Sequence, residues 1–147
     1  MDEMPPAENL GMIILAAGAS SRMKKPKQLL TISGTSMLRH VVETAKSTVF
    51  RPIVVVLGAN ADVLQSEAED VETVFNQNWR DGLSSSLKTG LCELLRISPD
   101  CAAALVVLAD QPLINAGHLN RFASVFREKN VAAVAAEYGG TIGVPAL

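Results

Sequence analysis

The chain has 147 residues and a formal net charge of −2, and 48% of its residues are hydrophobic while 19% are charged. These values are typical of one globular domain with a single core, and they exclude a disordered chain and, for want of a broad basic excess, general nucleic-acid binding. No apolar run reaches transmembrane length, and residues 1–8 are acidic where a secretory signal would be basic, so we expect no membrane contact and a cytoplasmic location.

Apolar runs of strand length alternate with amphipathic helical runs along the chain. This alternation predicts an α/β protein with a Rossmann-like, three-layer α/β/α fold and a mostly parallel sheet, after a polar tail at residues 1–10. The expected strands are residues 12–16, 53–57, 73–75, 103–108 and 131–135. The fourth run is apolar on both faces and should be central in the sheet.

Polar residues mark the expected helix ends. Ser36 should cap a helix whose apolar stripe holds Leu38, Val41, Val42 and Ala45. In the same way, Asn60 and Asn115 should cap the helices after the second and fourth strands, and a helix that begins near Ser84 should stop at residues 98–100.

The loop after the first strand is the most informative segment. Residues 15–30 read LAAGASSRMKKPKQLL, in which small residues let backbone N–H groups approach phosphate oxygens. The candidate nucleotide-binding residues there are Leu15, Ala16, Ala17, Gly18, Ser20, Arg22 and Lys27. Because Gly18 stands alone, the loop matches neither the P-loop nor the dinucleotide fingerprint. Local chemistry therefore leaves open both a triphosphate site and an ordinary turn beside a solvated basic face.

Asp110 closes the fourth expected strand in the sequence LADQP. Ligands bind beyond the carboxyl ends of parallel strands, so Asp110 and the first loop should face one crevice. A carboxylate there could hold a hard cation that bridges phosphates, and the alternative is an Asp that only caps the following turn.

A third candidate segment lies at residues 78–90. Gly82 would let the backbone approach a flat ring, and the hydroxyl of Ser85 or Ser86 could bind the polar edge of a pyrimidine. The alternative is a plain serine-rich helix cap. Trp79 is interpreted as core packing, and two cysteines without C-x-x-C spacing are interpreted as reduced structural thiols.

The pattern LAAGxSxRM at residues 15–23, followed by PKxLL at residues 26–30, resembles the opening signature of the MobA-like nucleotidyltransferases, and most closely the molybdenum cofactor cytidylyltransferases. The resemblance continues at residues 55–59, 78–87, 110–112 and 138–145. It implies a fold of the nucleotide-diphospho-sugar transferase type.

The resemblance also implies a reaction. CMP would move from CTP to a phosphorylated acceptor, molybdopterin, with release of pyrophosphate, and a molybdoenzyme would receive the product. Arg22, Lys27 and Asp110 would be the catalytic residues, with Asp110 binding Mg²⁺. Ala17 in place of glycine, and Pro26 before Lys27, look more like the cytidylyl than the guanylyl branch.

Two departures from the family pattern qualify these expectations. Lys24 stands where the family has glycine, and a second aspartate motif that family members carry further on has no match, so we expect a domain at residues 11–147 that is incomplete at its C-terminal side. The alternatives are therefore another sugar- or alditol-phosphate nucleotidyltransferase, and a non-catalytic nucleotide-binding or regulatory protein or inactive fragment.

Overall fold

A six-stranded, mostly parallel sheet forms the centre of the structure, which is a computed structural model describing residues 9–18, 31–32, 34–111, 113–129, 131, 133–138 and 140–147. The strand order is β5-β4-β1-β6-β8-β7. The four parallel strands are β1 (Leu10–Ala16), β4 (Ile53–Leu57), β5 (Glu72–Phe75) and β6 (Ala103–Leu108). β6 is one of the two middle strands, as its apolar sequence predicts.

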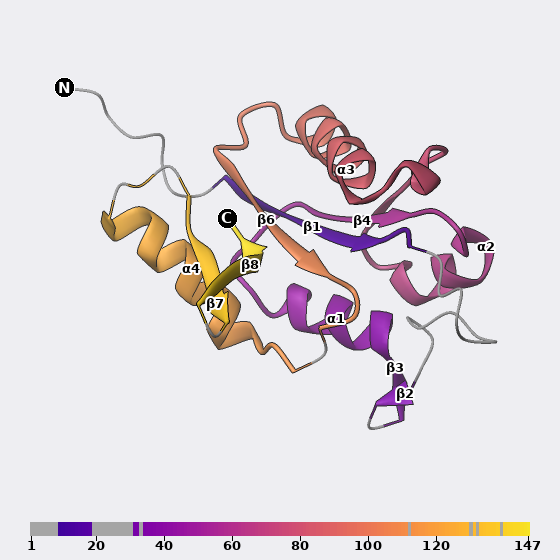
Figure 1. The fold of residues 1–147 in the computed structure, drawn as a ribbon, viewed down its shortest axis with the longest axis horizontal. Coiled ribbons are helices and arrows are strands. Elements are labelled where there is room, and N and C mark those ends of the chain that lie inside the picture. Colours follow the sequence, from indigo (N-terminus) through magenta and orange to yellow (C-terminus); the bar gives the residue numbers. More distant parts are fainter. Residues whose placement is uncertain are drawn as a thin grey trace.

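Helices cover both faces of this sheet (Figure 1). α3 (Leu83–Ile97) lies on one face, and α1 (Met37–Lys46) and α4 (Ala116–Lys129) lie on the other, which confirms the three-layer α/β/α architecture. The connections carry the short elements β2 (Thr31–Ile32), β3 (Thr35–Ser36), α2 (Ala61–Leu64), and the 3₁₀ turns η2 (Gln65–Ala68) and η3 (Trp79–Asp81). Within the described residues, no helix has the length and apolar content needed to span a bilayer.

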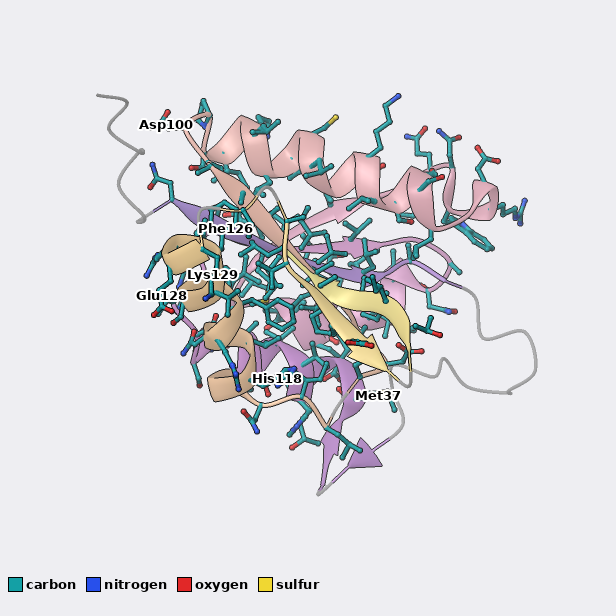
Figure 2. All side chains as sticks on the ribbon, turned by 60° about the vertical axis from the view of Figure 1, so that its left-hand side comes forward. Met37, Asp100, His118, Phe126, Glu128 and Lys129 are labelled. Atoms are coloured by element: carbon teal, nitrogen blue, oxygen red, sulfur yellow. The ribbon has the colours of Figure 1, made fainter. Side chains whose placement is uncertain are left out.

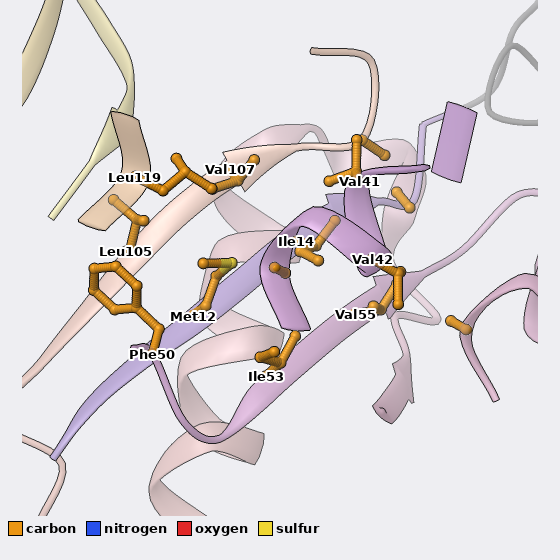
Figure 3. Close-up of a cluster of buried hydrophobic side chains, with 14 of the residues drawn as sticks. Met12, Ile14, Val41, Val42, Phe50, Ile53, Val55, Leu105, Val107 and Leu119 are labelled. Atoms are coloured by element: carbon orange, nitrogen blue, oxygen red, sulfur yellow. The ribbon is translucent and has the colours of Figure 1, made fainter. Parts of the chain in front are cut away.

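The core has two halves because successive side chains of a strand point to opposite faces. On β1, Met12 and Ile14 join a cluster with α1 and α4, drawn in Figure 3, whereas Ile13 and Leu15 join a second cluster under α3. α3 lies close to the sheet at Gly90, where a Cβ atom would come within 2.7 Å of Ile13. The strands β1 and β4 are buried along their whole length. Their carboxyl ends, which carry the candidate site, are therefore held in place by the core.

Two of the three predicted helix caps form. Ser36 Oγ accepts a hydrogen bond from the backbone N–H of Arg39 at 3.0 Å, and Asn115 Oδ1 accepts one from His118 N–H at 2.8 Å. The side-chain cap by Asn60 was wrong, because Asn60 makes no such bond at the start of α2. Its ψ is 34°, against 153° at Ser36, and a side-chain cap needs the extended backbone that Ser36 has.

The last predicted strand was misplaced. The strand expected at residues 131–135 is β7 (Ala135–Tyr138), paired with a strand that the sequence did not indicate, β8 (Thr141–Ala146). The turn of this hairpin contains Gly140 at a φ of 87°, and the position of the turn fixes which residues pair. β8 pairs antiparallel with β6, and β7 forms the edge of the sheet on that side.

Candidate functional site at the carboxyl ends of the parallel strands

The carboxyl ends of the four parallel strands lie next to one another. The sheet register pairs Leu15 with Leu108 and with Val56, and Leu57 with Phe75. The arrowheads of β1, β4 and β6 accordingly point to the same side of the molecule in Figure 1. The first loop, the β4 loop and the β6 loop therefore leave the sheet at one edge, where this class of sheet binds ligands.

Gly18 is an exposed residue directly after buried Ala17. A Cβ atom added to Gly18 would meet nothing within 4 Å, and the residue does not have the left-handed backbone that favours glycine. Within the described part of the chain, neither packing nor backbone conformation therefore requires glycine here. Ser20, Arg22 and Lys27 lie outside the described residues, so their assignment to phosphate stays a prediction.

Gly58, by contrast, is required by packing. A Cβ atom there would lie 2.7 Å from the carbonyl oxygen of Ala17, 2.7 Å from Trp79 Cβ and 2.9 Å from Ala17 Cβ. The backbone N–H of Ala59 also donates a hydrogen bond to Ala17 O at 3.1 Å, which holds the β4 loop against the end of β1. The ends of β1 and β4 and the turn at Trp79 thus fit together around this glycine.

Asp110 lies at an exposed position two residues beyond the end of β6. The backbone N–H of Ala109 donates to Leu15 O at 3.0 Å, so the β1–β6 ladder holds the chain up to the residue before Asp110. On its other side, Gln111 Nε2 donates to Val144 O at 3.1 Å and ties this segment to β8. The backbone that carries the Asp110 carboxylate is therefore fixed from both directions.

Among the described residues, no three His, Cys, Asp or Glu side chains come together as a metal cluster. Asp110 therefore offers a single carboxylate, which suits a Mg²⁺ ion that keeps several waters and shares its remaining positions with substrate phosphates. It does not suit a zinc or calcium cage built from protein ligands alone.

The start of α3 combines a glycine of positive φ with two serines that share one hydrogen-bond partner. Gly82 has a φ of 104° and open space where a Cβ would lie. Ser86 is only 4% exposed, and its Oγ accepts a hydrogen bond from Asn76 Nδ2 at 3.0 Å; Ser85 Oγ accepts a second one at 3.0 Å. The contacts of these hydroxyls with a base remain predictions. The structure shows that the side-chain amide of Asn76 donates hydrogen bonds to both hydroxyls.

Sequence reasoning missed Asn76, which directly follows β5 and is 2% exposed. Its backbone N–H donates to Leu57 O at 2.8 Å, so it lies beside Gly58 at the same edge of the sheet. An asparagine at the end of a strand is common in loops. What distinguishes Asn76 from such loop asparagines is that its side chain is buried against residues 85 and 86.

Trp79 is half-buried and packs against the core cluster under α3, which confirms its interpretation as a packing residue. The guanidinium of Arg80 lies 5.0 Å from its ring centroid. Next to this turn, a surface pocket of about 620 Å³ runs between β5 and α3, and Asn78 and Ser85 are among its lining residues. The cysteines are both free thiols, in agreement with the sequence.

Among the described residues, the ionisable groups whose pKa is clearly shifted lie away from this edge of the sheet. Hydrogen bonding to Lys46, together with the charges of Lys46 and Arg39, lowers the pKa of Asp70, and Arg96 lowers the pKa of Glu93 in the same way. Both carboxylates belong to surface ion pairs, at 2.8 Å for Lys46–Asp70 and 2.6 Å for Arg96–Glu93. We therefore assign these groups to surface stability rather than to chemistry.

Comparison with known proteins identifies relatives of the whole domain. A family model described as MobA-like NTP transferase domain matches residues 12–147. The bifunctional protein GlmU of Alkaliphilus oremlandii is 40% identical over 129 residues, which are 84% of this chain and 27% of that protein. The nicotine blue oxidoreductase of Paenarthrobacter nicotinovorans is 31% identical over 131 residues, 84% of this chain and 60% of that protein. The chain thus spans about a quarter of the length of the GlmU relatives.

Solved structures agree with the fold. Rv0371c from Mycobacterium tuberculosis H37Rv is 26% identical with a TM-score of 0.77, and the match covers 95% of this chain and 70% of that one. Its homologue from Mycobacterium sp. strain JC1 is 29% identical with a TM-score of 0.78, covering 95% and 69%. A third structure, a complex of Rv0371c with manganese, matches at 24% identity and a TM-score of 0.76, covering 94% and 69%. The relatives of this domain carry names of different activities.

Proposed function

Since the chain belongs to the MobA-like NTP transferase family, we propose that it transfers a nucleoside monophosphate from a nucleoside triphosphate to a phosphorylated acceptor and releases pyrophosphate. The observation that carries the proposal is the convergence at one edge of the sheet. The register of β1 with β6 pairs Leu15 with Leu108, and Ala17 and Asp110 each follow that pair by two residues, which supports a common site for the first loop and the Asp110 carboxylate.

The first loop is proposed to bind the triphosphate. Gly18 has open space in place of a side chain and no packing reason to be glycine within the described residues, which supports close approach of a ligand to its backbone. Lys27 and Arg22 would add charge-assisted hydrogen bonds to phosphate oxygens. These two cations carry the electrostatic part of the proposal.

Asp110 is proposed to hold a divalent cation, Mg²⁺, that neutralises charge on the triphosphate when bound. One exposed carboxylate with a fixed backbone fits an ion that is shared with substrate phosphates. The manganese complex of Rv0371c, a protein of the same fold, supports a divalent metal in this type of domain.

The reaction needs no nucleophile from the protein. An oxygen of the acceptor phosphate forms a bond to the α-phosphorus, the bond to the bridging oxygen breaks, and its electron pair leaves with pyrophosphate. The protein's part is to align the two reactants and stabilise the charge that develops, through the loop amides, Lys27 and Arg22.

The nucleotide is proposed to be CTP and the acceptor a molybdopterin-type compound. The proposal rests on Ala17 and on Pro26 before Lys27, the features that resemble the cytidylyl branch. Gly82, with its left-handed backbone and open surroundings, and the α3 start would recognise the base.

Pyrophosphate release tests the proposal when each of CTP, GTP, ATP and UTP is paired with molybdopterin, a sugar phosphate and an alditol phosphate in the presence of Mg²⁺. We expect release with CTP and molybdopterin, and its loss in Asp110→Asn. Asp100→Asn is the matched control, because Asp100 is also exposed but precedes β6 at the opposite end of the strand (Figure 2).

The other outcomes separate the alternatives. Release of pyrophosphate only with a sugar or alditol phosphate would support nucleotidyl transfer and show that the acceptor is that phosphate and not molybdopterin. Tight triphosphate binding without release for any pair supports the non-catalytic nucleotide-binding alternative. Absence of both binding and release would overturn the proposal.

A further inference from the structure

Asn76 is a buried polar residue whose amide connects three parts of the candidate site. Its Nδ2 group donates to Ser85 Oγ and to Ser86 Oγ, each at 3.0 Å, and its Oδ1 accepts from the backbone N–H of Asn78 at 3.0 Å. It is 2% exposed. A side chain in this position joins the end of β5, the turn at η3 and the first turn of α3.

The orientation of this amide follows from its partners. A backbone N–H can only donate, so the group that faces Asn78 N–H must be the carbonyl oxygen. The amide nitrogen then faces the two hydroxyls, which can accept. Both N–H groups and the carbonyl are thereby used inside the protein, and Asn76 has no hydrogen-bonding group left for a ligand.

A second bond closes the same turn. Ser85 Oγ donates to the carbonyl oxygen of Asn78 at 3.0 Å, so both the N–H and the carbonyl of Asn78 are held, one by Asn76 and one by Ser85. The segment between these anchors contains Gly82 with its φ of 104°. Backbone hydrogen bonds from Asp81 N–H to Asn78 O at 2.9 Å and from Gly82 N–H to Trp79 O at 3.4 Å also hold this turn. No side-chain cap supports the start of α3, so the Asn76 network adds side-chain hydrogen bonds that tie the turn to β5 and α3.

We infer that Asn76 is the positioning residue for base recognition: it sets the shape of the 78–82 turn and the direction of the Ser85 and Ser86 hydroxyls, and so determines how tightly the nucleoside part of the triphosphate binds. The inference rests on the proposed function, since it concerns the same site. Because Asn76 is buried and fully bonded, it acts through these neighbours and not by touching the nucleotide.

Calorimetry with two probes tests this role. Inorganic tripolyphosphate reports on the phosphate loop alone, and CTP reports on phosphate and base together, both with Mg²⁺. For Asn76→Ala we expect CTP affinity to fall by about tenfold or more, as for loss of a buried polar network, while tripolyphosphate affinity stays within about twofold of wild type.

Thr48→Val is the matched control for general destabilisation. Thr48 is 7% exposed, donates to Ala45 O at 2.6 Å and accepts from Phe50 N–H at 3.3 Å, so it also holds a buried polar network. It lies before β4, at the opposite end of that strand from the candidate site. Its loss should lower the melting temperature but leave the ratio of the two affinities unchanged.

Asn76→Asp is a second variant that tests the effect of Asn76 on CTP affinity if Asn76→Ala does not fold. The carboxylate retains the acceptor for Asn78 N–H but loses the amide donor, so the CTP affinity should fall less than in Asn76→Ala and still more than in Thr48→Val. Wild-type CTP affinity in the folded Asn76 variants would overturn the inference, as would equal losses for CTP and tripolyphosphate. Failure of the wild-type chain to bind either probe would overturn the proposed function itself.

Discussion

Gly58→Ala should destabilise the chain and displace the first loop. The added Cβ atom would lie 2.7 Å from Ala17 O and 2.7 Å from Trp79 Cβ, whereas ordinary contacts begin at 3.4 Å. One neighbour is backbone and the other is the first carbon of a half-buried side chain, so neither can move without moving its segment. The end of β1 and the η3 turn must therefore each move away from residue 58 by several tenths of an ångström.

Overpacking of this kind costs about 1–3 kcal/mol. For a chain of this size, each kcal/mol lowers the melting temperature by about 3–4 °C, so we expect a decrease of about 3–12 °C in thermal unfolding followed by circular dichroism. Because Ala17 precedes Gly18 directly, triphosphate binding should weaken in the same variant.

Gly117→Ala is the control for this experiment. A Cβ atom at Gly117, in α4, would meet only Asn115 Oδ1 at 3.4 Å, and alanine is the better helix former, so stability should not fall. A Gly58→Ala variant that melts at the wild-type temperature would show that the ends of β1 and β4 are not packed as described, and would refute the reasoning.

Three further predictions concern Gly18, Lys27 and Asp70. Gly18→Ala should melt like wild type, because its Cβ would meet no described residue within 4 Å, but it should bind CTP several-fold more weakly by calorimetry. Unchanged CTP affinity would show that Gly18 does not contact the nucleotide. Lys27→Ala should lose more triphosphate affinity than Lys25→Ala by roughly 1.5 kcal/mol or more, as expected for a charge-assisted contact. Equal losses in the two variants would indicate only a general electrostatic attraction of the triphosphate to the positive charges. The pairing with Lys46 and Arg39 lowers the pKa of Asp70, so its stabilising effect should be present at neutral pH and disappear as pH falls through that lowered pKa. Urea midpoints of wild type and Asp70→Asn should therefore differ slightly at neutral pH and converge in strong acid, and a difference that grows in acid would contradict the assignment.

The parallel part of the sheet could be predicted from the sequence because its central strands are apolar on both faces. The runs at residues 53–57 and 103–108 are continuous and apolar, and their predicted bounds match β4 and β6. β8 gave no such signal, since it contains Gly143 and Pro145, residues that weaken a strand. Its place in the sheet depends on pairing with β6 and β7, which no local pattern encodes.

The candidate site was predictable at its strand ends and not in its cross-contacts. Gly18 and Asp110 follow apolar strands, and the rule that ligands bind at carboxyl ends brings them together. Asn76 and Gly58 act through partners that fold next to them: Ser86, ten residues further along, and Trp79. Such contacts depend on how α3 and η3 pack onto the sheet, so sequence patterns could not reveal them.

The position of a bound nucleotide tests the central claim most directly. A crystal structure of the chain with a non-hydrolysable CTP analogue and Mg²⁺ should show the triphosphate against the backbone of Gly18, the ion on the carboxylate of Asp110, and the base at the 78–82 turn. A nucleotide bound elsewhere, for example in the pocket of about 240 Å³ that His118, Phe122 and neighbouring residues line between α4 and β7, would contradict the account.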